Sequence, residues 1–229
     1  MSAAASLERA GDVAILRMTA AENRFNPTTL AAIEAALDEV EQSAAALVLT
    51  GEGKFFSIGL DLDWMAAAGA VAAQDLLQRM QAVIARLLCL PVASVAALNG
   101  HAFAGGAMLA LACDVRVMRE DRGYFCLPEV DLGVAFTPAL TALLKERLPI
   151  GTAHEAMVTG RRYGAGEALV AGIVHDAVPV EHVLDVAVER AAALADKPRA
   201  TLAAIKRGLY ADTIAALEAV PVLPANLAG

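Results

Sequence analysis

Cysteine and histidine, which build disulfides and many metal sites, are scarce in this sequence. The 229 residues include three cysteines and four histidines. Cys89, Cys113 and Cys126 form no C-x-x-C pair and lie in apolar stretches, which predicts buried free thiols rather than disulfides or zinc ligands. The histidines also lack the spacing of a metal site, so we expect neither a metal nor a redox cofactor.

Long hydrophobic runs and an excess of positive charge are also missing. Although 58% of the residues are hydrophobic, the alanine-rich run from Met65 to Ala73 is interrupted by Gly69 and is too short to cross a bilayer. The N-terminus, Met1 to Gly11, has no basic segment followed by an apolar one, as a secretion signal would. A net charge of −8 argues against a nucleic-acid-binding surface. We therefore expect a soluble, cytoplasmic protein that binds neither nucleic acid nor membranes.

Apolar periodicity predicts a single α/β domain. Short apolar runs bounded by turn residues predict strands at 13–18, 45–50, 92–98, 115–118 and 124–127. Apolar residues at helical spacing predict intervening helices at 27–40, 74–88 and 105–112. The helical pattern then dominates, at 139–147, 152–159, 165–171, 180–195 and 199–218. Such alternation is typical of an α/β architecture with helices packed on the faces of a sheet.

Two glycine-containing loops are expected to expose backbone amide groups. The first, Lys54 to Leu62, is an apolar run broken at Gly59. The second, Asn99 to Met108, carries the pair Gly105-Gly106 between a predicted strand and a predicted helix. Glycine lets the main chain approach a ligand closely, and amides at a helix start face negative charge. Neither loop has the pattern of a dinucleotide site or a P-loop. Taken alone, the first loop is better explained as an ordinary turn.

A third segment, Leu127 to Gly133, places Glu129 between apolar neighbours. Buried glutamates are rare unless they are paired or reactive. An apolar pocket raises the pKa of a carboxyl group and suits it to proton transfer near neutral pH. On this segment alone, an ordinary acid in a surface loop is slightly the better explanation.

In this order, the three segments resemble the crotonase superfamily, which contains enoyl-CoA hydratases and isomerases. Phe56 to Asp61 matches its F-S-x-G-x-D pattern. Asn99 to Gly106, with Cys113-Asp114 after it, matches the N-G-x-A-x-G-G pattern and its C-D ending. The resemblance extends from about Val13 to Leu209.

The resemblance implies a fold, a substrate and a site. The fold would be a crotonase-like spiral of β-β-α units with a core at 1–195 and a shortened helical C-terminal segment at 196–229. The substrate would be an acyl-CoA, so that coenzyme A is part of the substrate and no separate cofactor is needed, and the chain would form a homotrimer or hexamer. The backbone amides of Leu60 and Gly105 would form an oxyanion hole. The residues implied to bind the substrate or its CoA moiety are Arg24, Ser57, Ile58, Gly59, Asp61 and Gly106. The stretch around Arg24 is equally explained as the start of a helix.

The departures from the hydratase pattern point to one reaction. Hydratases of this superfamily use two glutamates, and Met108 occupies the position of the first. A thioether cannot act as a base, which leaves Glu129 alone. The chain therefore resembles the Δ3,Δ2-enoyl-CoA isomerases, in which one glutamate moves a proton from C2 to C4 of a 3-enoyl-CoA during fatty acid β-oxidation. His101 is a weaker candidate for a second acid-base group. A hydratase or other crotonase reaction, and a non-catalytic binding relative, remain as alternatives.

Overall fold

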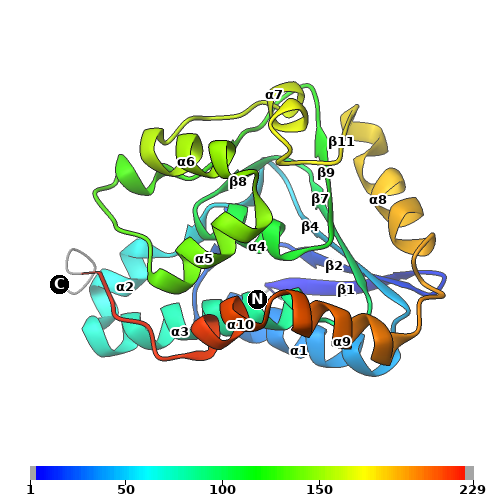
Figure 1. Cartoon of the computed structure of the whole chain (residues 1–229), viewed down its shortest axis with the longest axis horizontal. Coiled ribbons are helices and arrows are strands. Elements are labelled where there is room, and N and C mark those ends of the chain that lie inside the picture. The colour runs from blue at the N-terminus through cyan, green and yellow to red at the C-terminus, as the bar shows by residue number, and fades with distance from the viewer. Residues whose placement is uncertain (1–3, 225–229) are drawn as a thin grey trace.

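The computed structural model, which describes residues 4–224, is a mixed α/β fold built on a twisted sheet (Figure 1). In the largest sheet of the described chain the strand order is β1-β2-β4-β7-β9-β11, and only the β1–β2 pair is antiparallel. A smaller parallel sheet has the order β10-β8-β5, and β3 pairs with β6. In chain order the strands are β1 (Ala5–Ala10), β2 (Val13–Met18), β3 (Arg24–Phe25), β4 (Ala46–Gly51), β5 (Phe55–Ser57), β6 (Gly59–Leu60), β7 (Ala93–Leu98), β8 (His101–Phe103), β9 (Val115–Arg119), β10 (Phe125–Cys126) and β11 (Asp176–Val178).

The helices complete a repeated β-β-α unit. Strands β7 and β8 lead into α4, and β9 and β10 lead through a 3-10 turn into α5, so the expected crotonase-like spiral is confirmed. In chain order the helices and 3-10 turns are α1 (Pro27–Ser43), α2 (Leu62–Ala68), α3 (Ala70–Leu88), α4 (Gly105–Ala112), η1 (Pro128–Val130), α5 (Pro138–Arg147), α6 (Ile150–Thr159), α7 (Ala165–Val170), η2 (Val180–His182), α8 (Val183–Ala192), α9 (Arg199–Leu209) and α10 (Ala211–Glu218).

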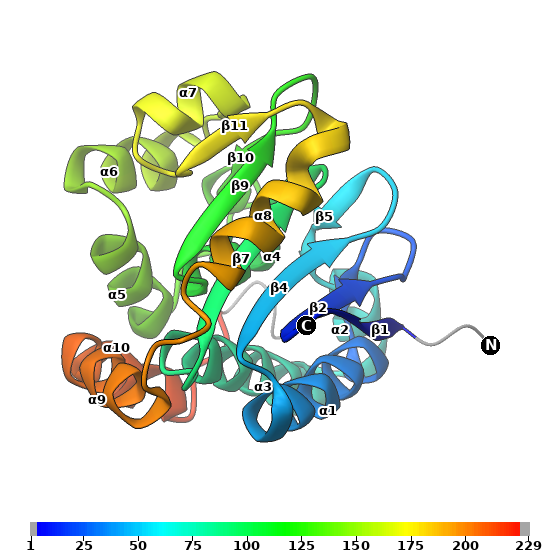
Figure 2. The same ribbon diagram turned by 90° about the vertical axis from the view of Figure 1, so that its right-hand side faces the viewer.

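The central strands are buried on both faces, as their nearly continuous apolar sequences require. In β4, Leu47 and Leu49 join the large core, whereas Ala46 and Val48 pack in a second cluster together with α8. Alternate side chains of a strand point to opposite faces, so α8 covers one face of the sheet and the large core lies on the other. Figure 2 shows α8 lying across β7 and β4.

Local sequence explains where helices α1 and α5 begin. The Asn26 side chain accepts hydrogen bonds from the amides of Thr28 and Thr29, and Pro27 occupies the first turn of α1. Thr137 accepts from the amide of Leu140 in the same way at the start of α5. Such side chains satisfy amides that have no partner within the helix, which fixes where each helix begins.

The structure adds strands that were not predicted and divides one predicted helix. The strands β3, β5, β6, β8 and β11 have two or three residues each and are too short to show a periodic pattern. Strand β1 was also not predicted, because its sequence lacks clear alternation and its order depends on pairing with β2. The prediction of one helix over 199–218 was wrong, since Tyr210 leaves helical geometry and separates α9 from α10. The Tyr210 ring is buried and its hydroxyl accepts a hydrogen bond from Arg147. The buried ring thus lies at the break between α9 and α10, which the spacing of apolar residues does not indicate.

The C-terminal helices fold back onto the rest of the chain. Helix α10 packs against α3 and α5, and its buried Ile214 and Leu217 belong to the large core. The chain after α10 then runs along α3, as Figure 1 shows in red. The predicted segment 196–229 thus shares the core of the preceding residues, and its last part, 225–229, lies outside the described residues. The boundary at residue 195 stays a prediction.

All three cysteines are buried free thiols, which confirms the prediction from their apolar surroundings. Among the described residues, none of the helices combines the length and the hydropathy that a membrane span requires. The same residues contain no group of three or more potential metal ligands.

Candidate active site

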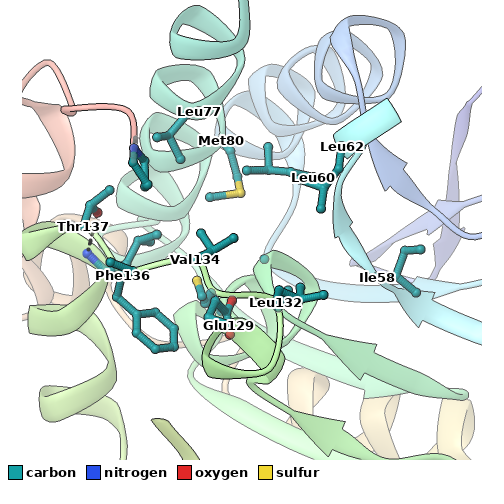
Figure 3. Close-up of a pocket in the computed structure, with 16 residues that line it drawn as sticks. Ile58, Leu60, Leu62, Leu77, Met80, Glu129, Leu132, Val134, Phe136 and Thr137 are labelled. Carbon is teal, nitrogen blue, oxygen red and sulfur yellow. Dashed lines mark hydrogen bonds between the residues drawn. The ribbon is translucent and has the colours of Figure 1, made fainter. Parts of the chain in front are cut away.

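A predominantly apolar pocket lies between the two glycine loops, α3, η1 and the start of α5 (Figure 3). Its lining residues are Ile58, Leu60, Leu62, Leu77, Met80, Ala104, Gly105, Met108, Glu129, Leu132, Val134, Ala135, Phe136, Thr137, Leu140 and Pro224.

The two glycine loops touch each other at Gly59 and Gly105. Gly59 has a φ of +85°, and a Cβ atom on it would lie 2.6 Å from the Gly105 nitrogen. A Cβ atom on Gly105 would lie 2.9 Å from the Met80 sulfur and 3.2 Å from the Gly59 Cα. The Gly59 position therefore requires glycine, whereas a side chain at Gly105 would displace the Met80 side chain, and the close contact holds the two loops together at the edge of the pocket.

The amide of Gly105 is placed by the start of α4. The first hydrogen bond of this helix runs from the Met108 amide to the Ala104 carbonyl, at 3.1 Å, so the helix provides no acceptor for the Gly105 amide. Ala104, which precedes it, has φ and ψ of 49° and −124°, a conformation unfavourable for a residue with a side chain. Backbone strain of this kind is concentrated at functional sites.

Leu60 brings the second predicted amide to the same pocket. It lies in β6, which pairs in parallel with β3, and the next amide, of Asp61, donates to the Phe25 carbonyl at 3.0 Å. Leu60 and Gly105 both line the pocket. The structure thus brings together the two residues that the sequence assigned to one site.

Glu129 faces this pocket from η1, directly after β10 (Figure 3). Its side chain is 7% exposed, and its Oε2 atom has no hydrogen-bond partner among the described residues. Burial in apolar surroundings destabilises the ionised carboxylate and raises the pKa of Glu129 to about 7. At neutral pH such a group can both take up and release a proton.

Met108 lines the pocket together with Glu129, and its side chain is buried. Among the lining side chains of residues 4–224, Glu129 is the only titratable one, and Thr137 is the only other polar one. The pocket therefore provides one acid-base group, and the apolar side chains around it offer few partners to which water could hydrogen-bond.

Of the residues predicted to bind CoA, Ile58 lines the pocket, whereas others support the loops. The Ser57 hydroxyl is fully buried, donates to the Asn23 carbonyl at 2.7 Å and accepts from the Gly59 amide at 3.1 Å. A Cβ atom on Gly106 would lie 2.2 Å from the Ser57 carbonyl oxygen. Ser57, Gly59 and Gly106 therefore fix the loop geometry, and the Ser57 hydroxyl has no direct access to the pocket.

Arg24 and Asp61 lie beside each other outside the pocket lining. The Asp61 carboxylate accepts from the Trp64 amide at the start of α2, and it lies 3.8 Å from the Arg24 guanidinium. Arg24 also pairs with Glu22 and Asp63, at 2.7 and 3.2 Å. This partly exposed cluster adjoins the loop that carries Leu60.

His101 lies apart from Glu129. It projects from β8 among the rings of Phe55, Phe103 and Tyr124, whose centroids are 5.1 to 5.6 Å from its own, and it does not line the pocket. Desolvation lowers the pKa of His101 below its usual value. We therefore interpret His101 as a member of an aromatic cluster rather than as a second acid-base group of this pocket.

Several lining residues were not identified from the sequence. Leu77 and Met80 come from α3, Thr137 and Leu140 from α5, and Pro224 from the chain after α10. Helical spacing had marked Leu77 and Met80 as buried. That signal shows that a side chain is buried, but not that it faces a ligand pocket.

Comparison with known families identifies related sequences over nearly the whole chain. A family model described as enoyl-CoA hydratase/isomerase matches residues 8–226. The enoyl-CoA delta isomerase 3 of Arabidopsis thaliana is 36% identical over 219 residues, covering 90% of this chain and 92% of the relative. A carnitinyl-CoA dehydratase of Proteus mirabilis is 35% identical over 179 residues, covering 78% of this chain and 68% of the relative.

Solved structures agree with the sequence matches. An enoyl-CoA isomerase of Mycobacterium tuberculosis, in its apo form, superposes with a TM-score of 0.88 at 30% identity, covering 95% of both chains. The similarity includes the elements that surround the pocket, because so little of either chain lies outside the match.

Proposed function

The chain belongs to the enoyl-CoA hydratase/isomerase family, and from that premise we propose that it converts 3-enoyl-CoA to 2-enoyl-CoA. The observation that carries this proposal is Glu129, the single titratable side chain lining a mostly apolar pocket, with its pKa raised to about 7. Relatives named enoyl-CoA delta isomerases support the same reaction.

In the proposed mechanism Glu129 acts first as a base and then as an acid. Its carboxylate takes a proton from C2 of the 3-enoyl thioester, and the electron pair moves into a dienolate whose negative charge lies largely on the thioester oxygen. The amides of Leu60 and Gly105 hydrogen-bond that oxygen. Protonated Glu129 then returns the proton at C4, and the double bond moves to C2–C3. No atom is gained or lost, so the reaction needs no co-reactant.

The oxyanion amides would stabilise charge where it develops, and removing one such donor typically costs about 100- to 1,000-fold in rate. Apolar lining residues support the transfer by keeping water away from the dienolate and from the shuttled proton. Met108 in place of a second acid disfavours hydration, because no second carboxylate is available in the described pocket to position a water molecule.

The test is Glu129→Gln, which keeps the shape of the side chain and removes the base. We expect the rate of 3-enoyl-CoA conversion, followed by the absorbance of the conjugated product thioester, to fall by about 100- to 10,000-fold. Asp131→Asn is the matched control, since this nearby carboxylate is exposed and does not line the pocket. Conversion that survives in Glu129→Gln would refute the mechanism.

The pH profile gives an independent readout of the same group. The base must be ionised to accept the C2 proton, so kcat/KM should rise with pH and level off above the Glu129 pKa of about 7. A profile that is flat from pH 5 to 8 would contradict the assignment.

The hydratase alternative is favoured by the similarity to a carnitinyl-CoA dehydratase and to solved structures named enoyl-CoA hydratases. Incubation with 2-enoyl-CoA separates the two reactions, because hydration removes the conjugated absorbance that isomerisation creates. Rapid loss of that signal would identify a hydratase.

We further propose that the substrate is an intermediate of fatty acid β-oxidation, that coenzyme A enters as part of the substrate with no other cofactor, and that the chain acts as a homotrimer or hexamer in the cytoplasm. The relatives include peroxisomal isomerases, so the location is best tested by fractionation with organelle markers.

A further inference from the structure

A buried polar pair forms part of the wall of the apolar pocket. Thr137, 5% exposed, lines the pocket, and Gln81 of α3 lies behind it with no exposed surface. The Gln81 Nε2 atom donates to the Thr137 hydroxyl oxygen at 3.3 Å. Apart from Glu129, Thr137 is the only lining residue with a polar side chain among those described.

The hydrogen bonds of this pair are incomplete. A threonine hydroxyl can accept two hydrogen bonds and donate one. The Thr137 oxygen already accepts from the Leu140 amide at 3.2 Å and from Gln81, so only its proton remains to be donated. No described group accepts that proton, and the Gln81 Oε1 atom also lacks a partner. In the orientation that the structure gives, Gln81 donates and the Thr137 proton faces the pocket, whereas a reversed amide would accept that proton and leave unpaired only N–H groups of Gln81, which does not line the pocket.

The role of Thr137 in capping α5 does not explain Gln81. A cap needs only the bond from Leu140, and the position of Gln81 is surrounded by apolar residues of α3. A leucine there would avoid burying an unpaired amide, which destabilises a fold. Such incompletely bonded groups in an otherwise apolar pocket suggest that a ligand supplies the missing partner.

Thr137 lies on the far side of Glu129 from the CoA loop. In Figure 3, Ile58 and Thr137 occupy opposite sides of Glu129, with Leu77 on the Thr137 side. If the thioester lies at Glu129 with CoA towards Ile58, the acyl chain extends towards Thr137. The position of Thr137 is given by the structure, and only the orientation of the acyl chain rests on the proposed function.

We propose that the pocket selects acyl-CoA thioesters whose chain carries an oxygen function, a hydroxyl or oxo group, beyond the reacting carbons. The Thr137 hydroxyl donates a hydrogen bond to that oxygen, and Gln81 holds the hydroxyl in place. A purely apolar pocket has the opposite preference, because a buried hydroxyl without a partner is disfavoured.

The test is binding of saturated decanoyl-CoA and of derivatives that each carry one hydroxyl group, placed at successive carbons beyond C4, measured by titration calorimetry. At least one derivative should bind the full-length protein about 10-fold more tightly than decanoyl-CoA, a typical gain for one satisfied hydrogen bond. If every hydroxyl weakens binding, or if the protein binds none of these thioesters, the proposal is rejected.

Variants of Thr137 identify the donor. Thr137→Ser keeps both the helix cap and the hydroxyl and should keep the preference, whereas Thr137→Val should reduce the ratio of the two affinities to one or below. A preference that persists in Thr137→Val would reject the assignment to Thr137, and the wild-type series decides the proposal even if this variant does not fold. These titrations need no turnover, so a preference without isomerase activity supports this inference and rejects the proposed function. Isomerase activity without the preference rejects this inference and supports the proposed function.

Discussion

Gly59 combines a positive φ with a close steric contact between the two loops of the site. Its positive φ of +85° is unfavourable for any side chain, and a Cβ atom would lie 2.6 Å from the nitrogen of Gly105. That nitrogen bears one of the two amides proposed to hold the thioester oxygen. A single methyl group should therefore displace one amide of the proposed oxyanion hole without touching Glu129.

We expect Gly59→Ala to lower kcat/KM for 3-enoyl-CoA by about 100- to 1,000-fold, the effect of losing one oxyanion donor. Gly53→Ala is the matched control, because Gly53 also has a positive φ, +75°, but no atom lies within 4 Å of its added Cβ. The control should lose about 1 kcal/mol of stability and keep its activity. Equal losses of activity in both variants would show that backbone strain, rather than displacement of the Gly105 amide, is responsible.

At the scale of the element, α9 is held to the core by a buried lysine. Lys206 is 4% exposed, and its Nζ atom lies 2.6 Å from the Asp114 carboxylate and 2.9 Å from the Val92 carbonyl oxygen. The same carboxylate accepts from the amide and hydroxyl of Ser94. This network joins α9 to β7 and to the chain that follows α4.

Lys206→Met keeps much of the side-chain volume but leaves the Asp114 carboxylate without its cation. Removing one member of a buried ion pair is strongly destabilising, so we expect a loss of about 2 to 4 kcal/mol in the free energy of unfolding, measured with denaturant. Arg190→Ala breaks the more exposed pair with Asp176 and should cost about 1 kcal/mol or less. Similar losses in the two variants would show that Lys206 is not a special anchor of α9.

At the scale of the whole molecule, the isolated chain leaves apolar side chains in water. On α9, Ile205 is 61% exposed and Leu209 is 64% exposed. Burying such groups against other copies is favourable, because apolar surface removed from water contributes about 25 cal/mol per Å². This surface supports the proposed assembly into trimers or hexamers.

Sedimentation equilibrium should therefore give a mass of at least three times 23.6 kDa at micromolar concentration. Ile205→Lys should shift the distribution towards smaller species if α9 takes part in the contact, and Lys197→Glu, on the same face of the molecule but without apolar surface, provides a control for charge. A mass of one chain throughout the concentration range would reject the oligomer.

From the sequence alone, the strongly periodic elements and the segment that carries the proposed catalytic acid could be predicted. Strand β2 and helix α4 span the predicted residues, 13–18 and 105–112. Their limits could be predicted because apolar periodicity and glycines at the ends of elements are local properties of the chain. Glu129 was identified through the resemblance of its segment to the family pattern, and the structure shows that its side chain is buried.

Only the tertiary structure decided what each buried group faces. Leu77, Thr137 and Pro224 are remote in sequence and meet at one pocket because α3, α5 and the chain after α10 pack together. The Ser57 hydroxyl turns inward to the Asn23 carbonyl, and Tyr210 separates two helices where apolar spacing indicates one. Periodicity records that a side chain leaves water, but its partner depends on contacts between distant segments, and those contacts determine the shape and polarity of the site.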